Sequence, residues 1–224
     1  MTSREQSYDA AADETGSEQM SRSARERILE VAGLLFNEKG YDGTTIRDIM
    51  QRANASNATL VKYFENKSGL FSAYVVEMGK KMTDFTDIAD DAALPVLLHR
   101  MGRKILGDFT PGLISYRSAI GSINNHPQIG RIIYENVQLR VIDAVGRQLA
   151  AWAMRNQTTI EDVEGEASRF LQLLTAGSWQ RVLYAVQERP SEAEIESDVR
   201  AAVNTLLYGL EVGSPSQGYR RNHR

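Results

Sequence analysis

The sequence predicts an all-α protein of about nine helices, arranged as a small N-terminal domain of three helices followed by a larger helical bundle. Apolar residues recur every three or four positions along most of the 224-residue chain, which is the spacing of one helix face. Residues that begin or end helices, such as Ser, Thr, Asn, Pro and Gly, stand between these stretches. We find no segment in which apolar and polar residues alternate as they do in a strand.

The composition is that of a globular protein, with 42% hydrophobic and 25% charged residues. No apolar run approaches the roughly 18 residues that a membrane helix needs, and the N-terminus lacks the apolar core of a secretory signal. The chain has no cysteine, which excludes disulfides and thiol chemistry and fits a reducing compartment. We therefore expect a cytoplasmic protein that does not bind membranes.

Four regions are expected along the chain. Residues 1–20 are polar, lack apolar periodicity and hold five acidic residues against one arginine, which predicts a disordered tail. Residues 21–68 and 69–212 are predicted to form the two helical domains, and residues 213–224 a flexible tail with turn residues. The net charge is −3, but residues 21–70 hold eight basic and six acidic side chains, whereas residues 1–20 and residues 71–224 are each net negative. This distribution weakly favours an N-terminal contact with nucleic acid.

The N-terminal domain is predicted to begin with a helix near Ser23, whose spacing to Glu26 is that of a capping box. Gly40 is predicted to end this helix, because glycine commonly stands just past a helix end. The apolar side of the helix consists of Ile28, Ala32, Leu35 and Phe36.

Two short helices follow, separated by a tight turn. The first begins at Thr44 or Thr45, and Thr45 and Asp48 again have the spacing of a capping box. Asn54 tolerates the left-handed backbone that a tight exit requires, and Ser56 caps the next helix. Their inward faces are apolar and consist of Ile46, Ile49, Met50, Ala53, Leu60, Tyr63 and Phe64. This is the layout of a helix-turn-helix, whose second helix enters the DNA major groove.

The outward face of the second short helix suits that groove. Asn57 can pair with adenine, and Ala58 or Thr59 can meet a thymine methyl group. Lys62 and Lys67 stand near the ends of the unit, where contacts to phosphates would set its register on the DNA. A solvent-exposed helix face with no ligand is the alternative for Asn57 and Lys62.

The segment GYDGTTIRDIMQRANASNATLVKYFENKSGLF resembles the DNA-binding domain of the tetracycline-repressor (TetR) family over about residues 22–75. Asn54 and Ala58 replace glycines that are usual in the family, and Val61 replaces a tyrosine that contacts phosphate. The residues that follow the family pattern in order are Thr44, Thr45, Ile46, Arg47, Ile49, Ala53, Ser56, Leu60, Tyr63, Phe64, Asn66, Lys67 and Leu70. We predict DNA contacts from Arg25, Thr44, Thr45, Arg47, Ser56, Asn57, Ala58, Thr59, Lys62, Tyr63 and Lys67.

The rest of the chain is predicted to be helical. Pro127 opens a long segment that continues to Trp152, because proline is favoured in a first helical turn. Another helix is predicted at about residues 160–188, and Ser191 with Glu194 caps the last. Similarity to the family implies that the last two helices pair with those of a second copy. The interface residues predicted are Phe170, Leu174, Val203, Leu206 and Leu210.

The resemblance also implies a cavity for a small effector. The aromatic residues that could line it are Phe109, Tyr116, Tyr134, Trp152 and Trp179, although each could instead fill the core. No cluster of charges projects clearly into this region, so we expect a neutral or weakly polar, mostly apolar organic molecule.

We therefore predict a sequence-specific transcriptional regulator that binds pseudo-palindromic double-stranded DNA as a homodimer. The resemblance to the family implies a repressor that leaves its operator DNA when an effector binds. No cofactor or metal is expected, because the three histidines have no ligand spacing. The alternative is a helical ligand-binding module or an enzyme that does not bind DNA, but the sequence shows no nucleophile–base constellation.

Overall fold

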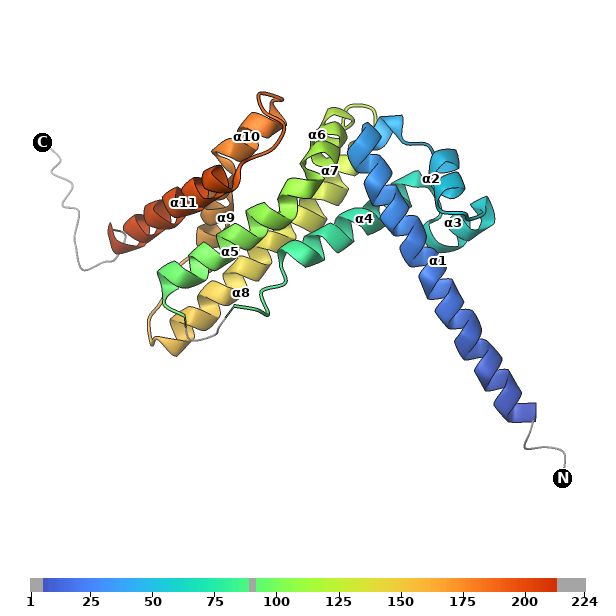
Figure 1. Ribbon diagram of the computed structural model, residues 1–224. Coiled ribbons are helices and arrows are strands. Elements are labelled where there is room, and N and C mark those ends of the chain that lie inside the picture. The colour runs from blue at the N-terminus through green and yellow to red at the C-terminus, as the bar shows by residue number, and fades with distance from the viewer. Residues whose placement is uncertain (1–5, 89–91, 213–224) are drawn as a thin grey trace, which may run out of the picture. The chain divides into compact units, whose positions relative to one another are not determined.

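The computed structural model describes residues 6–88 and 92–212, with side chains from residue 24 to residue 210 outside that gap. Every regular element of these residues is helical, which confirms the predicted all-α fold (Figure 1). The elements are α1 (Gln6–Gly43), α2 (Ile46–Arg52), α3 (Asn57–Phe64), α4 (Lys67–Met82), α5 (Leu94–Phe109), a 3-10 turn (Thr110–Gly112), α6 (Leu113–Gly121), α7 (Pro127–Ile133), a π-helical turn (Tyr134–Gln138), α8 (Leu139–Arg155), α9 (Val163–Thr175), α10 (Ser178–Leu183) and α11 (Glu192–Val212). The nine predicted helices correspond to this set with α7 and α8 taken as one helix and α9 and α10 as another. None of the described helices is long and apolar enough to cross a membrane.

The chain divides into two compact units rather than at the single boundary predicted between residues 68 and 69. The first unit comprises the described part of Met1–Val76 and Ile114–Ile132, and the second comprises Glu77–Leu113 and the described residues from Ile133 onward. The first ten residues of α4 belong to the first unit because their aromatic side chains pack on α1. The Phe71 ring stands edge-on to the Phe36 ring, with centroids 5.1 Å apart.

Helix α1 begins at Gln6 rather than near Ser23, so residues 6–20 are helical where a disordered tail was predicted. The stretch contains no proline and includes three consecutive alanines, and a helix that is already nucleated adds further residues readily. Residues 1–5 and the predicted tail at 213–224 lie outside the described residues.

The regular part of α1 is interrupted at Gly40, as predicted. The backbone there has φ 74° and ψ 179°, a conformation that glycine adopts readily and other residues rarely. The turn brings in Thr44, whose hydroxyl donates hydrogen bonds to the carbonyls of Gly40 and Leu35 at 2.7 and 3.0 Å. The backbone nitrogen of Tyr41 donates to Ser118 Oγ at 3.2 Å. A Cβ atom on residue 40 would clash with that hydroxyl.

The second unit is a helical bundle in which α11 packs against α5 and α9, and α9 packs against α8. Arg103 of α5 joins α11 by donating to Glu196 at 2.9 Å and to Glu192 at 3.0 Å. His99 Nε2 lies 2.8 Å from a carboxylate oxygen of Glu196. The core of the unit includes the fully buried side chains of Leu97, Leu98, Met101, Ile105, Val145, Leu149, Phe170, Leu174 and Val199.

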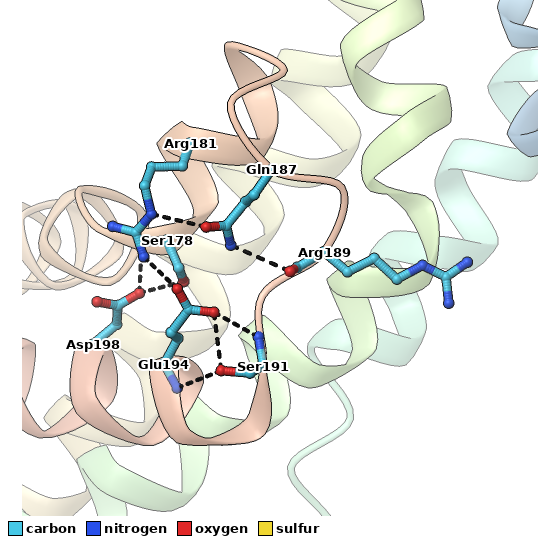
Figure 2. Close-up of polar contacts among 7 residues, drawn as sticks. All are labelled: Ser178, Arg181, Gln187, Arg189, Ser191, Glu194 and Asp198. Atoms are coloured by element: carbon cyan, nitrogen blue, oxygen red, sulfur yellow. Dashed lines mark hydrogen bonds and ion pairs between the residues drawn. The ribbon is translucent and has the colours of Figure 1, made fainter.

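The helix predicted over about residues 160–188 is divided, since α9 ends at Thr175 and α10 begins at Ser178. Between them Gly177 has a non-helical ψ of −117°. Asp198 of α11 accepts hydrogen bonds from the backbone nitrogen and the hydroxyl of Ser178 at 2.8 and 2.5 Å (Figure 2). A carboxylate from another helix therefore binds the first donors of α10, and the hydrogen-bond ladder of α9 does not continue through them.

Side-chain hydrogen bonds hold the loop between α10 and α11 (Figure 2). Arg181 donates to Gln187 Oε1 at 2.9 Å and to Glu194 Oε1 at 2.7 Å. The predicted capping box is confirmed, because Glu194 accepts from the backbone nitrogen of Ser191 at 2.8 Å and its own nitrogen donates to Ser191 Oγ at 3.2 Å. These bonds, the one from the Ser191 backbone foremost, lower the pKa of Glu194 to about 2.

Replacing Gly40 with alanine is expected to lower the free energy of unfolding by about 1–3 kcal/mol, because a Cβ atom disfavours this backbone conformation and meets Ser118. Urea unfolding followed by circular dichroism measures the change. Gly107→Ala is the control, since a Cβ atom at this position in α5 meets nothing within 4 Å. That variant should be as stable as the wild type or more so. Equal losses in both variants would contradict the explanation.

Glu194 should make stability depend on pH under acidic conditions. Its pKa is about 2 in the folded protein and ordinarily 4.5, so the unfolded chain binds the proton first as the pH falls. Its contribution to stability is complete above about pH 4.5 and is lost as the pH falls toward 2. Glu194→Gln is expected to flatten the melting temperature against pH in this window. Glu188→Gln, at an exposed residue of the same loop, should keep the wild-type slope, and a wild-type slope in Glu194→Gln would refute the assignment.

Candidate DNA-binding interface

Helices α2 and α3 are joined by the tight turn of residues 53–56. Asn54 has φ 48°, which is the left-handed backbone predicted for it, and its nitrogen donates to the Gln51 carbonyl at 3.3 Å. Arg27 of α1 donates from Nε to the Ala53 carbonyl at 2.9 Å, so a side chain of α1 also caps the end of α2. The turn is therefore held both by its own backbone and by the preceding helix.

Both short helices begin at the predicted capping residue. Thr45 Oγ1 accepts from the Asp48 nitrogen at 3.1 Å, and Ser56 Oγ accepts from the Thr59 nitrogen at 3.1 Å. The hydroxyls of Ser56 and Thr59 also lie 2.9 Å apart. The Asp48 carboxylate is 3.2 Å from Lys39 Nζ, and this hydrogen bond is the main reason that the pKa of Asp48 is lowered. These side chains fix where each helix starts.

The inward face of α3 is anchored by Leu60 and Phe64, which are buried, as are Ile49 and Met50 of α2. The guanidinium of Arg25 lies over the Phe64 ring, with Cζ 5.3 Å from the ring centroid. Arg25 therefore links α1 to the end of α3 and keeps its positive charge at the edge of the unit.

The outward face of α3 presents Asn57, Ala58, Val61 and Lys62, all exposed. Val61 is 60% exposed, which leaves a branched apolar side chain in the middle of a polar face. Such a side chain can contact a thymine methyl group, whereas Asn57 can hydrogen-bond a base edge. The face is therefore small, partly apolar and able to donate and accept hydrogen bonds.

A hollow of about 600 Å³ lies between the outer faces of α2 and α3. Arg47 and Asn57, which were both predicted to contact DNA, line this same hollow. It also includes Gln51, which the sequence pattern did not single out. Gln51 is exposed and stands four residues after Arg47, so it occupies the same outward face of α2. That spacing is the signal that could have identified it.

The charges of this region are divided between paired and unpaired groups. Lys39 lies 3.2 Å from Asp48, and Arg52 lies 3.0 Å from Glu38. Arg47 and Lys62 are exposed, and neither belongs to the ion pairs found among the described residues. The unpaired positive charge is thus concentrated on the outer faces of α2 and α3.

Thr44 does not belong to this surface, and its prediction as a DNA contact is wrong. Its side chain is fully buried, and its hydroxyl is bound to the carbonyls of Leu35 and Gly40. These two bonds tie the turn after Gly40 back to α1. Thr45, the neighbouring residue in the sequence, is the exposed one.

Lys67 and Tyr63 are half-buried rather than fully exposed. Lys67 Nζ lies 4.4 Å from the centroid of the Tyr41 ring, and burial lowers its pKa while the charge of Asp42 opposes that change. Lys62 Nζ lies 5.2 Å from the centroid of the Tyr63 ring. Both lysines are therefore held against aromatic rings, with Lys62 the more accessible of the two.

The five aromatic residues predicted for an effector cavity occupy different environments. Phe109 and Trp179 are buried, and their ring centroids are 5.3 Å apart. Tyr116 is buried in α6, which belongs mainly to the other unit, Trp152 is half-buried, and Tyr134 is 57% exposed.

The residues predicted for the dimer interface face the interior of their own chain. Phe170 and Leu174 are 0% exposed, and Val203 and Leu206 are nearly as buried, while Leu210 is half-buried. The first four therefore cannot meet a second copy without unfolding the bundle. Their apolar character reflects the packing of α9 and α11 against each other and α5, which the apolar pattern alone did not distinguish from an intermolecular contact.

Comparison with known proteins identifies both parts of the chain. Residues 28–74 match the family model described as bacterial regulatory proteins, tetR family, and residues 98–209 match the AefR-like transcriptional repressor, C-terminal domain. The probable HTH-type transcriptional regulator YttP of Bacillus subtilis is 28% identical over 120 residues, which are 54% of this chain and 53% of YttP. The biofilm regulator IcaR of Staphylococcus epidermidis is 36% identical over 61 residues, 27% of this chain and 33% of IcaR. The chain thus spans about half or less of the length of these curated relatives.

Solved structures share the fold over most of the chain. A crystal structure described as a TetR-family transcriptional regulator from Mesorhizobium loti has a TM-score of 0.72 and 25% identity, covering 84% of this chain and 96% of that one. The flavonoid-responsive regulator FrrA has a TM-score of 0.60 and 21% identity, covering 84% and 96%. The chain belongs to the TetR family of transcriptional regulators.

Proposed function

We propose that this protein is a repressor that binds a pseudo-palindromic operator as a homodimer and is released by a small, mostly apolar organic effector. The observation that carries DNA binding is the capped α2–α3 pair, whose outer faces hold the unpaired cations Arg47 and Lys62 beside the exposed Asn57. In this layout the second helix enters the major groove and the first helix crosses the DNA backbone.

The exposed residues divide by their chemistry into two roles. Asn57 and Gln51 carry amides that can pair with the edge of an adenine, and Val61 with Ala58 can contact thymine methyl groups. Phosphate contacts come from basic and hydroxyl side chains around this face, which position the protein without reading sequence. This second set consists of Arg25, Thr45, Arg47, Lys62, Tyr63 and Lys67.

We place the dimer interface on the outer face of α11, because the residues predicted from apolar pattern are buried within the chain. The exposed side chains along this face are small and recur every four residues, which would allow two helices to approach closely. They are Ala193, Ser197, Ala201, Thr205 and Gly209. Tyr208 beside them is 70% exposed, and aromatic residues are enriched in interfaces.

Two observations favour repression with release by an effector. The C-terminal match is to a domain described as a transcriptional repressor, and the name of FrrA, which shares the fold, describes a response to flavonoids. The buried Phe109–Trp179 pair supplies aromatic surface for an apolar ligand in the second unit. Linkage requires that the effector and operator weaken each other by the same factor, which for allosteric proteins is about 5- to 150-fold.

A gel-shift titration on DNA taken from upstream of the protein's own gene tests the function directly. We expect a discrete complex that survives excess unrelated DNA. If the protein bound this DNA and the unrelated DNA equally well at every salt concentration, it would not be a sequence-specific regulator.

Lys62→Ala should weaken binding to all DNA sequences alike, because Lys62 contacts phosphate. The slope of log affinity against log salt concentration should become shallower by about 0.9 for each phosphate that the variant no longer neutralises. Lys39→Ala is the matched control, since Lys39 is already paired with Asp48 and its removal should leave the slope nearly unchanged. Equal slopes for Lys62→Ala and the wild type would remove Lys62 from the interface.

Ala201→Glu should convert the dimer to a monomer. A residue at the centre of a two-fold contact between helices lies opposite the same residue of the partner subunit. Two carboxylates would then be forced together and desolvated. Sedimentation velocity measures the change. Ala150→Glu, an exposed position on α8, is the control and should remain dimeric. A dimer in both variants would place the interface elsewhere.

A further inference from the structure

Arg140 of α8 has a buried hydrogen-bond donor without an acceptor among the described residues. Its Nε atom is buried and has no hydrogen-bond partner in the described structure. The ion pairs formed among the described residues do not include Arg140. A guanidinium carries five N–H donors and stays charged, and a buried donor without an acceptor is unfavourable. The Nε donor of Arg140 therefore has no acceptor among the described residues.

Several other arginines of the same unit are paired with carboxylates, while exposed ones such as Arg100 and Arg200 belong to none of the ion pairs of the described residues. Arg103 meets Glu192 and Glu196, and Arg181 meets Glu194. Arg147, two turns after Arg140 on α8, pairs with Asp143.

Two carboxylates close in sequence to the contact between α4 and Arg140 are already engaged. Asp143 follows Arg140 on α8 and is bound by Arg147. Glu77 of α4 lies 2.8 Å from Lys80 Nζ. An acceptor for Arg140 is therefore not available from these residues without breaking an existing pair.

The alkyl part of Arg140 lies against the second half of α4. Gly79 of α4 is buried, and a Cβ atom added there would lie 3.0 Å from Arg140 Cδ and would clash with the carbonyl oxygen of Asn136. Asn136 belongs to the π-helical turn Tyr134–Gln138 that precedes α8, and such turns are frequent at functional sites. A group bound by Arg140 would therefore sit beside α4, the helix that follows α3 in the chain.

We propose that Arg140 binds the carboxylate of the effector, which would be an organic acid with an apolar body. This rests on the proposed function, and it replaces the expectation of a neutral effector. A carboxylate offers two oxygens that match the fork of a guanidinium, and charge-assisted hydrogen bonds of this kind are stronger than neutral ones. An uncharged analogue of the same shape leaves the arginine unpaired, so the site discriminates between them.

The test compares 4-phenylbutyrate with 4-phenylbutanol, which share an apolar body and differ in the end group. Isothermal titration at pH 7 is done on the protein alone, without DNA. We expect the acid to bind the wild type at least about tenfold more tightly than the alcohol, which is the discrimination expected of a charged hydrogen bond. Arg140→Gln should lose this preference. Arg140→Met serves as a second variant if the first fails to fold.

Arg147→Gln is the matched control, because it removes the same charge from the same helix at an exposed, paired position. It should keep the wild-type preference for the acid. The proposal is overturned if the acid does not bind, if acid and alcohol bind alike, or if Arg147→Gln loses the preference in place of Arg140→Gln. Because no DNA is present, these outcomes are independent of the gel shift. A protein that binds operator but not the acid would retain the proposed function and lose this ligand class.

Discussion

The left-handed backbone at Gly40 determines where the two DNA-facing helices begin. Only a residue without a Cβ atom fits there, since the space is taken by Ser118. The hydroxyl of Thr44 binds the carbonyls of Leu35 and Gly40 inside the unit and so ties the turn to α1. Thr45 is thereby placed at the surface as the first cap of α2. Loss of this junction would affect every later contact, because α2 and α3 are positioned from it.

The two short helices depend on α1 because neither could be stable alone. Helices of seven and eight residues are below the roughly 12–15 residues at which isolated helices become marginally stable. Arg27 binds the end of α2, and Arg25 lies over Phe64 at the end of α3. These two arginines therefore have structural partners, which leaves Arg47 and Lys62 as the more available charges for phosphate. Which basic residues remain available for phosphate thus depends on which of them already stabilise a helix.

Local signals predicted the N-terminal elements well, because caps and turns are decided by neighbouring residues. Thr45, Asn54, Ser56 and the Ser191–Glu194 capping box all have the roles expected from spacing. The failures concern contacts between distant residues. Nothing near Ser178 in the sequence indicates that Asp198 will end the preceding helix. Burial was the other property that the sequence could not decide, since an apolar residue on a helix looks the same whether it meets its own core or a second chain. The predicted interface residues Phe170 and Leu174 proved to be core.

The missing acceptor of Arg140 Nε would contribute to the binding of a carboxylate. Arg140 Nε is a buried donor without an acceptor among the described residues, and such a donor carries a free-energy cost. A ligand that supplies the acceptor removes this penalty, so part of the binding free energy comes from relief of an existing cost. A built-in carboxylate partner would make the empty protein more stable and would remove that gain. On this proposal, selectivity for an acid over its neutral analogue would depend on the chain leaving Arg140 Nε without an acceptor of its own.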